Sequence, residues 1–308
     1  MRKSFFLILP IVLMLFGCFT GIENTGRISE KDVAKVKADK QSAEALYLDS
    51  VRPDSFQQWR PGKQFFVSDD NIRLIFDPIN GIDSETLSLK GDTLIYQGYK
   101  FRKNLNNTED VVINFSDGVN TYSYDTGKPI EEVETQKPEY VVPFVIDLDY
   151  INKVQSKLKD KTLYIKSPLW FEEDLRKLNG VKFVPVTIKY VKPGDLIYPF
   201  HVFFEYKNRI YGVSMSSQVS SIKNTTFDKL FSFNDIRKNY GTISDDNWVL
   251  ITKGRVAVGM TKEECSLSLG TPKTIDRSPT HGGLYERWRY DNGTYLMFDN
   301  GLLLQYRR

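Results

Sequence analysis

The chain is poor in the residues that most often carry chemistry. Its 308 residues include only two cysteines and two histidines. Two cysteines cannot build a disulfide scaffold, so the stability of the chain has to come from packed cores. The formal net charge is only +3, whereas a nucleic-acid-binding protein carries a strong basic excess. We therefore expect no nucleic-acid partner.

Long apolar runs are also missing, apart from one at the start of the chain. Arg2 and Lys3 precede the stretch Phe5–Phe16, which only Pro10 interrupts. A membrane-spanning helix needs about 20 apolar residues, whereas a basic start followed by a short apolar core is typical of a secretory signal. The alternative is that residues 1–17 form a buried or membrane helix that is kept.

The residues that close this run resemble the lipobox of bacterial lipoproteins. Leu15, Phe16 and Gly17 precede Cys18, although Phe16 is bulkier than the small residue usual there. The resemblance implies that cleavage leaves Cys18 as a lipidated first residue, which attaches the protein to a membrane. It also implies the outer membrane, because an aspartate after the cysteine favours the inner membrane and Phe19 stands there instead. We expect the protein to face the periplasm.

Four segments are expected after the signal. Residues 18–58 are polar and charged, which predicts a tether behind the lipidated cysteine. Residues 59–128 and 144–240 alternate aromatic and β-branched stretches with turn residues, which predicts two β modules joined by a linker at 129–143. Residues 241–308 form the last domain. The strands predicted in the first module are Gln64–Val67, Ile72–Phe76, Thr93–Tyr96, Val111–Phe115 and Thr121–Tyr124.

A weak internal repeat connects the two β modules. Leu89–Tyr96 aligns with Leu158–Ile165, and Val112–Phe115 aligns with Val202–Glu205. Self-similarity at this scale predicts two related modules in tandem, each of a length that suits a small SH3-like barrel. Chance similarity between aromatic-rich β sequences is the alternative.

The C-terminal segment carries the clearest local signals. Asp245–Asn247 caps a predicted short helix that begins at Trp248, and Thr261 with Glu264 makes a capping box for a second helix that Gly270 ends. Two Asn-Gly turns then join three predicted strands into a meander. These strands are Tyr285–Tyr290, Thr294–Phe298 and Leu302–Tyr306.

Residues 248–306 resemble the SmpA/OmlA (BamE-like) domain. The resemblance rests on Gly259–Glu264, Leu269–Pro272, Glu286–Tyr290 and Tyr295–Leu302. It implies two helices packed on a three-stranded sheet, in an outer-membrane lipoprotein that binds other proteins and is not an enzyme. The expected fold class is therefore α+β, with two tandem small antiparallel β modules followed by an α-α-β-β-β BamE-like domain.

Candidates for chemistry are few. His201 and His281 would serve a hydrolase only within a concave polar site, and no serine lies in a Gly-x-Ser-x-Gly setting. Cys265 lies on a short amphipathic helix, which favours a core thiol over a nucleophile. Three acidic clusters lack the alternating spacing that wraps a calcium ion. They are residues 69–71, 172–174 and 245–247. We therefore expect no catalytic residue, cofactor or metal.

Aromatic side chains are the better candidates for binding. Trp170 and Phe171 lie between predicted strands, so we expect Trp170 to be exposed and this pair to contact a partner. The expected function is a lipid-anchored, non-enzymatic cell-envelope scaffold that binds proteins, in outer-membrane assembly or maintenance. A carbohydrate or peptidoglycan binder is the alternative, and an envelope hydrolase is a third hypothesis.

Overall fold

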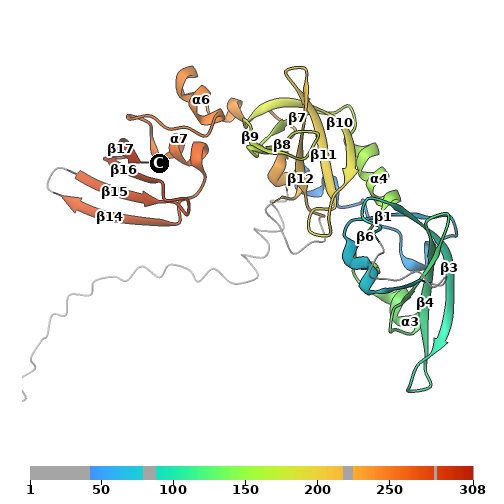
Figure 1. Ribbon diagram of the computed structural model, residues 1–308. Helices are drawn as coiled ribbons and strands as arrows, with labels where there is room; N and C mark the ends of the chain where they lie inside the picture. Colours follow the sequence, from blue (N-terminus) through green and yellow to red (C-terminus); the bar gives the residue numbers. More distant parts are fainter. Residues whose placement is uncertain (1–41, 79–87, 218–224, 281–282, 308) are drawn as a thin grey trace, which may run out of the picture. The chain divides into compact units, whose positions relative to one another are not determined.

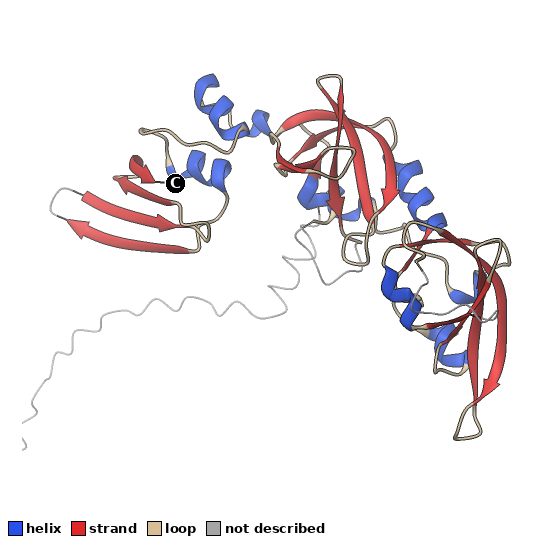
Figure 2. Cartoon of the chain, in the orientation of Figure 1, coloured by secondary structure: helices blue, strands red, loops and turns tan. Residues whose placement is uncertain are grey.

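A computed structural model describes residues 42–78, 88–217, 225–280 and 283–307 of the chain (Figure 1). Within these residues three antiparallel sheets carry the fold, and the helices between the strands are short (Figure 2). No helix among them is long and apolar enough to cross a bilayer. The predicted signal segment and Cys18 lie outside the described residues.

The first sheet has six strands in the order β2-β5-β4-β3-β1-β6. Its core contains Val67, Ile113 and Phe115 from the strands, and each of three short helices adds one buried side chain: Phe56, Ile72 and Val133. The strands are β1 (Gln64–Val67), β2 (Phe76–Pro78), β3 (Thr93–Lys103), β4 (Glu109–Ser116), β5 (Thr121–Asp125) and β6 (Val145–Asp147). The helices are η1 (Phe56–Gln58), η2 (Asp70–Leu74) and α3 (Ile130–Thr135).

The second sheet has seven strands in the order β13-β7-β10-β11-β12-β8-β9. Helix α4 (Leu148–Leu158) buries one apolar face, with Ile151, Val154 and Leu158 at helical spacing, in the core of this sheet. The strands are β7 (Thr162–Ile165), β8 (Leu169–Phe171), β9 (Lys177–Asn179), β10 (Val184–Pro193), β11 (Phe200–Tyr206), β12 (Arg209–Met215) and β13 (Phe231–Ser232). Helix α5 (Phe227–Leu230) precedes β13.

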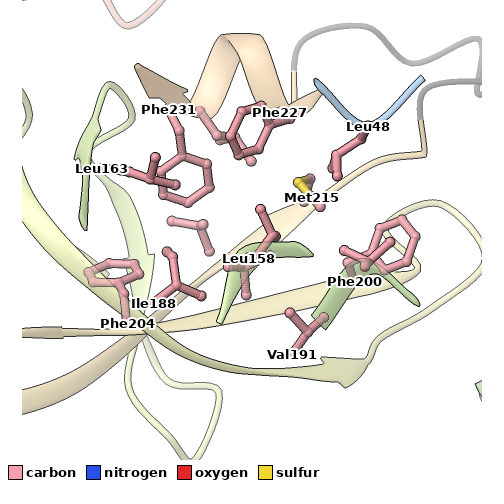
Figure 3. Close-up of a cluster of buried hydrophobic side chains, with 14 of the residues drawn as sticks. Leu48, Leu158, Leu163, Ile188, Val191, Phe200, Phe204, Met215, Phe227 and Phe231 are labelled. Carbon is pink, nitrogen blue, oxygen red and sulfur yellow. The ribbon is translucent and has the colours of Figure 1, made fainter. Parts of the chain in front are cut away.

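The N-terminal end of the described chain also belongs to the second sheet. Tyr47 of helix α2 (Ala43–Tyr47) packs its ring at a tilt against Phe227 of α5, with ring centroids 5.1 Å apart. Glu44 of the same helix accepts a hydrogen bond from the amide of Phe233. Leu48 lies in the same buried cluster as Phe227 and Phe231, as Figure 3 shows. Residues 43–58 are therefore not part of a polar tether as predicted, because they include the helices α2 and η1 and because Leu48 and Val51 are buried in the second core and Phe56 in the first.

The third sheet has four strands in the order β14-β15-β16-β17, with α6 (Asp245–Thr252) and α7 (Lys262–Leu269) before them. Trp288, Phe298 and Leu303 pack with Met260 and Cys265 in its core. The strands are β14 (Thr274–Thr280), β15 (Gly283–Arg289), β16 (Tyr295–Asp299) and β17 (Leu302–Arg307). A further short helix, η3 (Ile236–Asn239), precedes α6.

Two local predictions for this segment have different outcomes. The capping box is confirmed, because Thr261 Oγ1 accepts from the Glu264 amide at 3.2 Å and a Glu264 carboxylate oxygen accepts from the Thr261 amide at 2.7 Å. The first helix starts earlier than predicted, at Asp245, because the side chain of Ser244 caps it. Asp245 to Asn247 are thus helical residues, and the cap lies one residue before them.

The predicted fold class is wrong. The chain is mostly β, the tail has four strands instead of three, and it is not an α-α-β-β-β BamE-like domain. The first two sheets do not close into small barrels, because within the described residues the strands at both ends of each sheet pair on one side only. The sequence does not indicate the fourth strand of the tail, because β14 shows no alternation of apolar and polar residues and contains Pro279. An edge strand such as β14 tolerates a proline.

Two further predictions fail in the first module. Residues 129–143 are not a linker: α3 lies within them, Tyr140 and Val142 are buried in the first core, and β6 then pairs with β1. The predicted strand Ile72–Phe76 is mostly the 3-10 helix η2, because the Asp69 side chain caps the amide of Asn71 and starts a helical turn.

Candidate binding site

Trp170 lies in the core of the second sheet and not on its surface. Its side chain is 3% exposed, and its ring packs edge-on against Phe204 with ring centroids 5.0 Å apart. The indole nitrogen donates to the carbonyl of Ser167 at 2.8 Å. Gly180 covers the ring so closely that a Cβ there would lie 2.1 Å from the indole. The prediction that Trp170 is exposed is therefore wrong, because the β8–β9 pairing turns the indole into the sheet.

Phe171 points to the opposite face of β8, as the alternation of a strand requires. Its ring meets His201 and Phe203 edge-on, with centroids 5.1 and 5.5 Å apart. It also lies so close to Gly212 of β12 that a Cβ there would be 2.2 Å from the ring. Phe171 is 6% exposed. The two aromatic residues thus pack on separate faces and do not form a joint platform on which a sugar ring stacks.

A cleft does open beside these residues. Its volume is about 470 Å³, and polar groups of Asn179, Ser214 and Thr225 line it together with apolar side chains. The Thr225 hydroxyl is buried and has no hydrogen-bond partner within the described residues. We call this the hairpin cleft; its lining residues are Ser167, Leu169, Trp170, Phe171, Lys177, Leu178, Asn179, Tyr198, Ser214, Thr225 and Leu230.

One residue of the cleft lining, Ser214, lies beside a histidine. Ser214 Oγ and His201 Nδ1 lie 3.4 Å apart across the β11–β12 ladder. Burial lowers the pKa of His201, and the nearby Asp195 opposes this shift. His201 itself does not line the cleft, and its ring is held between Phe171 and the turn at Gly194. The other histidine, His281, lies outside the described residues.

The remaining sequence candidates have structural partners. Cys265 is fully buried, and burial together with the Glu264 charge raises the pKa of its thiol to about 12, so the predicted core thiol is confirmed. Asp70 accepts hydrogen bonds from the amides of Leu89 and Lys90. Within the described residues no group of three or more His, Cys, Asp or Glu side chains is arranged to hold a metal ion.

A second, smaller cavity lies where β6 runs into α4. Its volume is about 230 Å³ and its walls are mostly apolar, with Trp59 and Tyr140 among the buried side chains. Its rim carries two exposed aliphatic residues, Val141 (56% exposed) and Leu196 (46%). We call this the anchor pocket; its lining residues are Pro53, Asp54, Trp59, Phe65, Tyr140, Val141, Val142, Val145, Ile146, Asp147, Tyr150, Leu196, Pro199 and Ser217.

Local sequence explains how the anchor pocket forms. Asp147 is the last residue of β6 and also the N-cap of α4, where its carboxylate accepts from the amides of Asp149 and Tyr150. The strand therefore turns into the helix without an intervening loop. Tyr150, one helical turn later, donates to or accepts from the Ser217 hydroxyl at 3.1 Å and packs against Phe200. The β6–α4 connection and the contacts of Tyr150 therefore hold the wall of the pocket in place.

A buried lysine lies behind the carboxylates of this wall. Lys63 Nζ is 2.8 Å from Asp54, 2.9 Å from Asp147 and 2.6 Å from Asp149, and its side chain is 4% exposed. Burial disfavours the ammonium group, but the hydrogen bonds to the three carboxylates outweigh it and raise the pKa of Lys63 above its usual range. Burial also raises the pKa of Asp147, although Lys63 opposes this shift. Lys153 forms a further ion pair with Asp54 at 2.6 Å.

No pattern in the sequence indicates the anchor pocket, because its parts are far apart along the chain. Lys63, Asp147 and Leu196 belong to different strands or loops, and no short motif connects them. Comparison with known proteins adds no further guide: no family model, no curated protein and no solved structure matches this chain. The site therefore has to be interpreted from its own geometry.

Proposed function

We propose that this chain is a lipid-anchored, non-enzymatic cell-envelope protein that binds other proteins. The observation that carries the proposal is the anchor pocket, a narrow apolar cavity with an exposed aliphatic rim at Val141 and Leu196. Pockets for whole small ligands measure roughly 300–1,000 Å³, and this one is smaller. Its size suits a single buried side chain, which is how the central residues of protein interfaces gain most of their binding energy.

Membrane attachment in this proposal rests on the leader sequence and Cys18. Removal of a signal and acylation of a cysteine would leave the described part of the chain in the envelope, held near a membrane surface. Mass spectrometry of the native protein tests this step. The expected result is a mature chain that starts at an acylated Cys18, and a Cys18→Ser variant that leaves the membrane fraction. An unacylated wild-type protein would contradict lipid attachment at Cys18.

Affinity capture from solubilised membranes tests protein binding through the pocket. The bait is the tagged full chain, compared with Leu196→Asp at the pocket rim and with Leu74→Asp as a matched control on η2, where Leu74 is 74% exposed. The expected result is a specific partner that is recovered with wild type and with Leu74→Asp but lost with Leu196→Asp. Equal recovery with all three baits, or no partner above background, would count against the proposal.

Glycan binding is the second candidate, because the hairpin cleft contains a buried hydroxyl, that of Thr225, which has no partner among the residues that the structure describes. Thr225, Asn179 and Ser214 together offer the hydroxyl and amide groups that bind polyols. Sedimentation with purified peptidoglycan sacculi distinguishes the candidates. If glycan binding is the function, wild type co-sediments and Asn179→Ala does not, while Leu196→Asp has no effect. The leading proposal predicts no co-sedimentation of any of the three proteins.

A further inference from the structure

We infer that the anchor pocket receives an apolar side chain whose neighbour is a cationic group, as in a partner segment where a lysine or arginine flanks an aliphatic residue. This inference rests on the proposed function and adds the chemistry of the occupant. Its basis is the charge of the pocket lining. Asp54 and Asp147 are the charged residues among the fourteen that line the pocket, and no lysine, arginine or histidine is among them.

The ion-pair cluster beside the pocket keeps this negative bias. Around Lys63 three carboxylates share two ammonium groups, those of Lys63 and Lys153, so the cluster carries one excess negative charge. Two further charged side chains of opposite sign, Arg52 and Glu139, act on Tyr150 in the pocket wall. The local field at the pocket therefore favours an arriving cation.

Asp54 is the carboxylate that an arriving cation would meet. Its side chain is 26% exposed, whereas that of Asp147 is 10% exposed. One Asp54 oxygen accepts from Lys63 and the other accepts from Lys153. A carboxylate oxygen has room for more than one donor, so the partly exposed Asp54 carboxylate in the pocket lining retains acceptor capacity.

An anionic or neutral occupant fits the pocket less well. An anionic group would meet Asp54 with a like charge, which disfavours binding. A neutral apolar group would cover the Asp54 carboxylate and remove water from it without replacing the lost hydrogen bonds. A cationic group next to the apolar side chain replaces that water with a charge-assisted hydrogen bond. The partner chemistry therefore follows from Asp54 at the edge of an otherwise apolar cavity.

Fluorine NMR of the full chain labelled with fluorotryptophan tests the inference with three small probes. Isopentylguanidinium, isopentanol and isovalerate share a branched apolar group and differ in charge. Trp59 lines the pocket and reports on its occupancy, while Trp170 in the hairpin cleft serves as an internal control. We expect all saturable shifts at Trp59, with the cation binding about fivefold to tenfold more tightly than the alcohol and the carboxylate binding most weakly.

Variants then separate the two levels of the proposal. Asp54→Asn should bring the ratio of the affinities of cation and alcohol close to one and leave the affinity of isopentanol within about twofold of wild type. The control variant Asp77→Asn changes an exposed carboxylate elsewhere on the first sheet and should leave this ratio unchanged. Equal affinities of cation and alcohol for the wild-type chain would overturn the inference about charge and leave the protein-binding proposal intact. No shift at Trp59 with any probe would overturn both, because the pocket would then not admit an apolar side chain.

Discussion

The first and second sheets share one strand order, although they differ in length and in what they expose. When β1 to β6 are matched to β7, β8, β10, β11, β12 and β13, each pairing of the first sheet has a counterpart in the second. A short helix, α3 or α5, precedes the last strand in both sheets. Each also has a bulge at the same place, after Tyr96 in β3 and after Ile188 in β10. The two modules thus share a topology.

The differences lie in the additions to this common plan. The second sheet has the extra strand β9, and its pairing with β8 buries Trp170 and opens the hairpin cleft. The first sheet ends in β6, which continues into α4 and creates the anchor pocket with the Lys63 cluster. The shared strands therefore form the two cores. The candidate sites come from the inserted β8–β9 hairpin and from the direct connection between β6 and α4.

The largest expected effect tests whether Trp170 belongs to the core. Trp170→Ala should lower the free energy of unfolding by about 3–5 kcal/mol, because it leaves a cavity among buried aromatic rings. Leu169→Ala, at a neighbouring side chain that is 71% exposed, should change it by less than about 0.5 kcal/mol. Denaturant titration followed by circular dichroism measures both. A Trp170→Ala protein of wild-type stability that fails to bind sacculi would restore a ligand-binding role for Trp170.

The next effect concerns ion pairs in the two sheets. Lys63→Met should cost about 3 kcal/mol of stability, because it leaves the carboxylates of Asp147 and Asp54 without their shared partner. Lys189→Met in the second sheet removes a partly exposed ion pair with Glu205 and should cost no more than about 0.5 kcal/mol. The same denaturant titrations apply. Equal losses of stability would show that the ion pairs of Lys63 stabilise the β6–α4 connection no more than an exposed ion pair does.

As the pH rises, the contribution of Lys182, just before β10, to folding stability should increase, unlike that of Lys63. Lys182 donates to the carbonyl of Ser268 at 2.7 Å, faces no carboxylate at this contact, and burial lowers its pKa from 10.5 to about 8. Between these two pH values the unfolded chain holds more protons than the folded chain, so folding stability rises with pH. The unfolding free energy of wild type minus that of Lys182→Met should increase by about 2 kcal/mol from pH 8 to pH 10.5.

Lys63→Met provides the contrast for that measurement. The folded-state pKa of Lys63 is raised, so its contribution to stability is fully present below the unfolded pKa of 10.5 and is lost only at higher pH. The difference between wild type and Lys63→Met should therefore stay flat over the same range. A falling or flat difference for Lys182→Met would contradict the burial of a charged ammonium at that position.

The smallest effect compares two threonines in corresponding connections, Thr126 between β5 and α3 and Thr225 between β12 and α5. Thr126 Oγ1 donates to the carbonyl of Val111 at 2.8 Å, whereas the Thr225 hydroxyl has no partner in the described residues. Thr126→Val should cost about 1 kcal/mol, and Thr225→Val should be neutral or slightly stabilising. Thermal denaturation of the purified variants checks this. A clear loss of stability in Thr225→Val would reveal a hydrogen bond to that hydroxyl.

Local signals predicted the parts of the fold that depend on neighbouring residues. Gln64–Val67 is a strand with the predicted bounds, and the Thr261–Glu264 capping box forms as expected. Both depend on chemistry within a few residues, such as alternation or reciprocal capping. The strand β14 and the second-module position of residues 42–51 depend on tertiary pairing, so no local pattern indicated them.

The repeat alignment shows how a small error in register hides an equivalence. The sequence aligned Phe115 with Glu205, whereas the matching bulges place Phe115 opposite Tyr96 and Phe204 opposite Ile188. The alignment is therefore one residue out of register in this strand, and a shift of one residue exchanges the two faces of a strand. The other aligned pair matched β3 with β7, although the counterpart of β3 is β10.

Site-specific photocrosslinking in intact cells tests the central claim most directly, because it compares the two candidate sites in one experiment. A crosslinking residue replaces either Leu196 at the rim of the anchor pocket or Leu169 at the rim of the hairpin cleft, and both side chains are exposed. The account predicts a discrete protein conjugate from position 196 that Asp54→Asn weakens, and none from position 169. A glycan conjugate from position 169, with nothing from position 196, would contradict it.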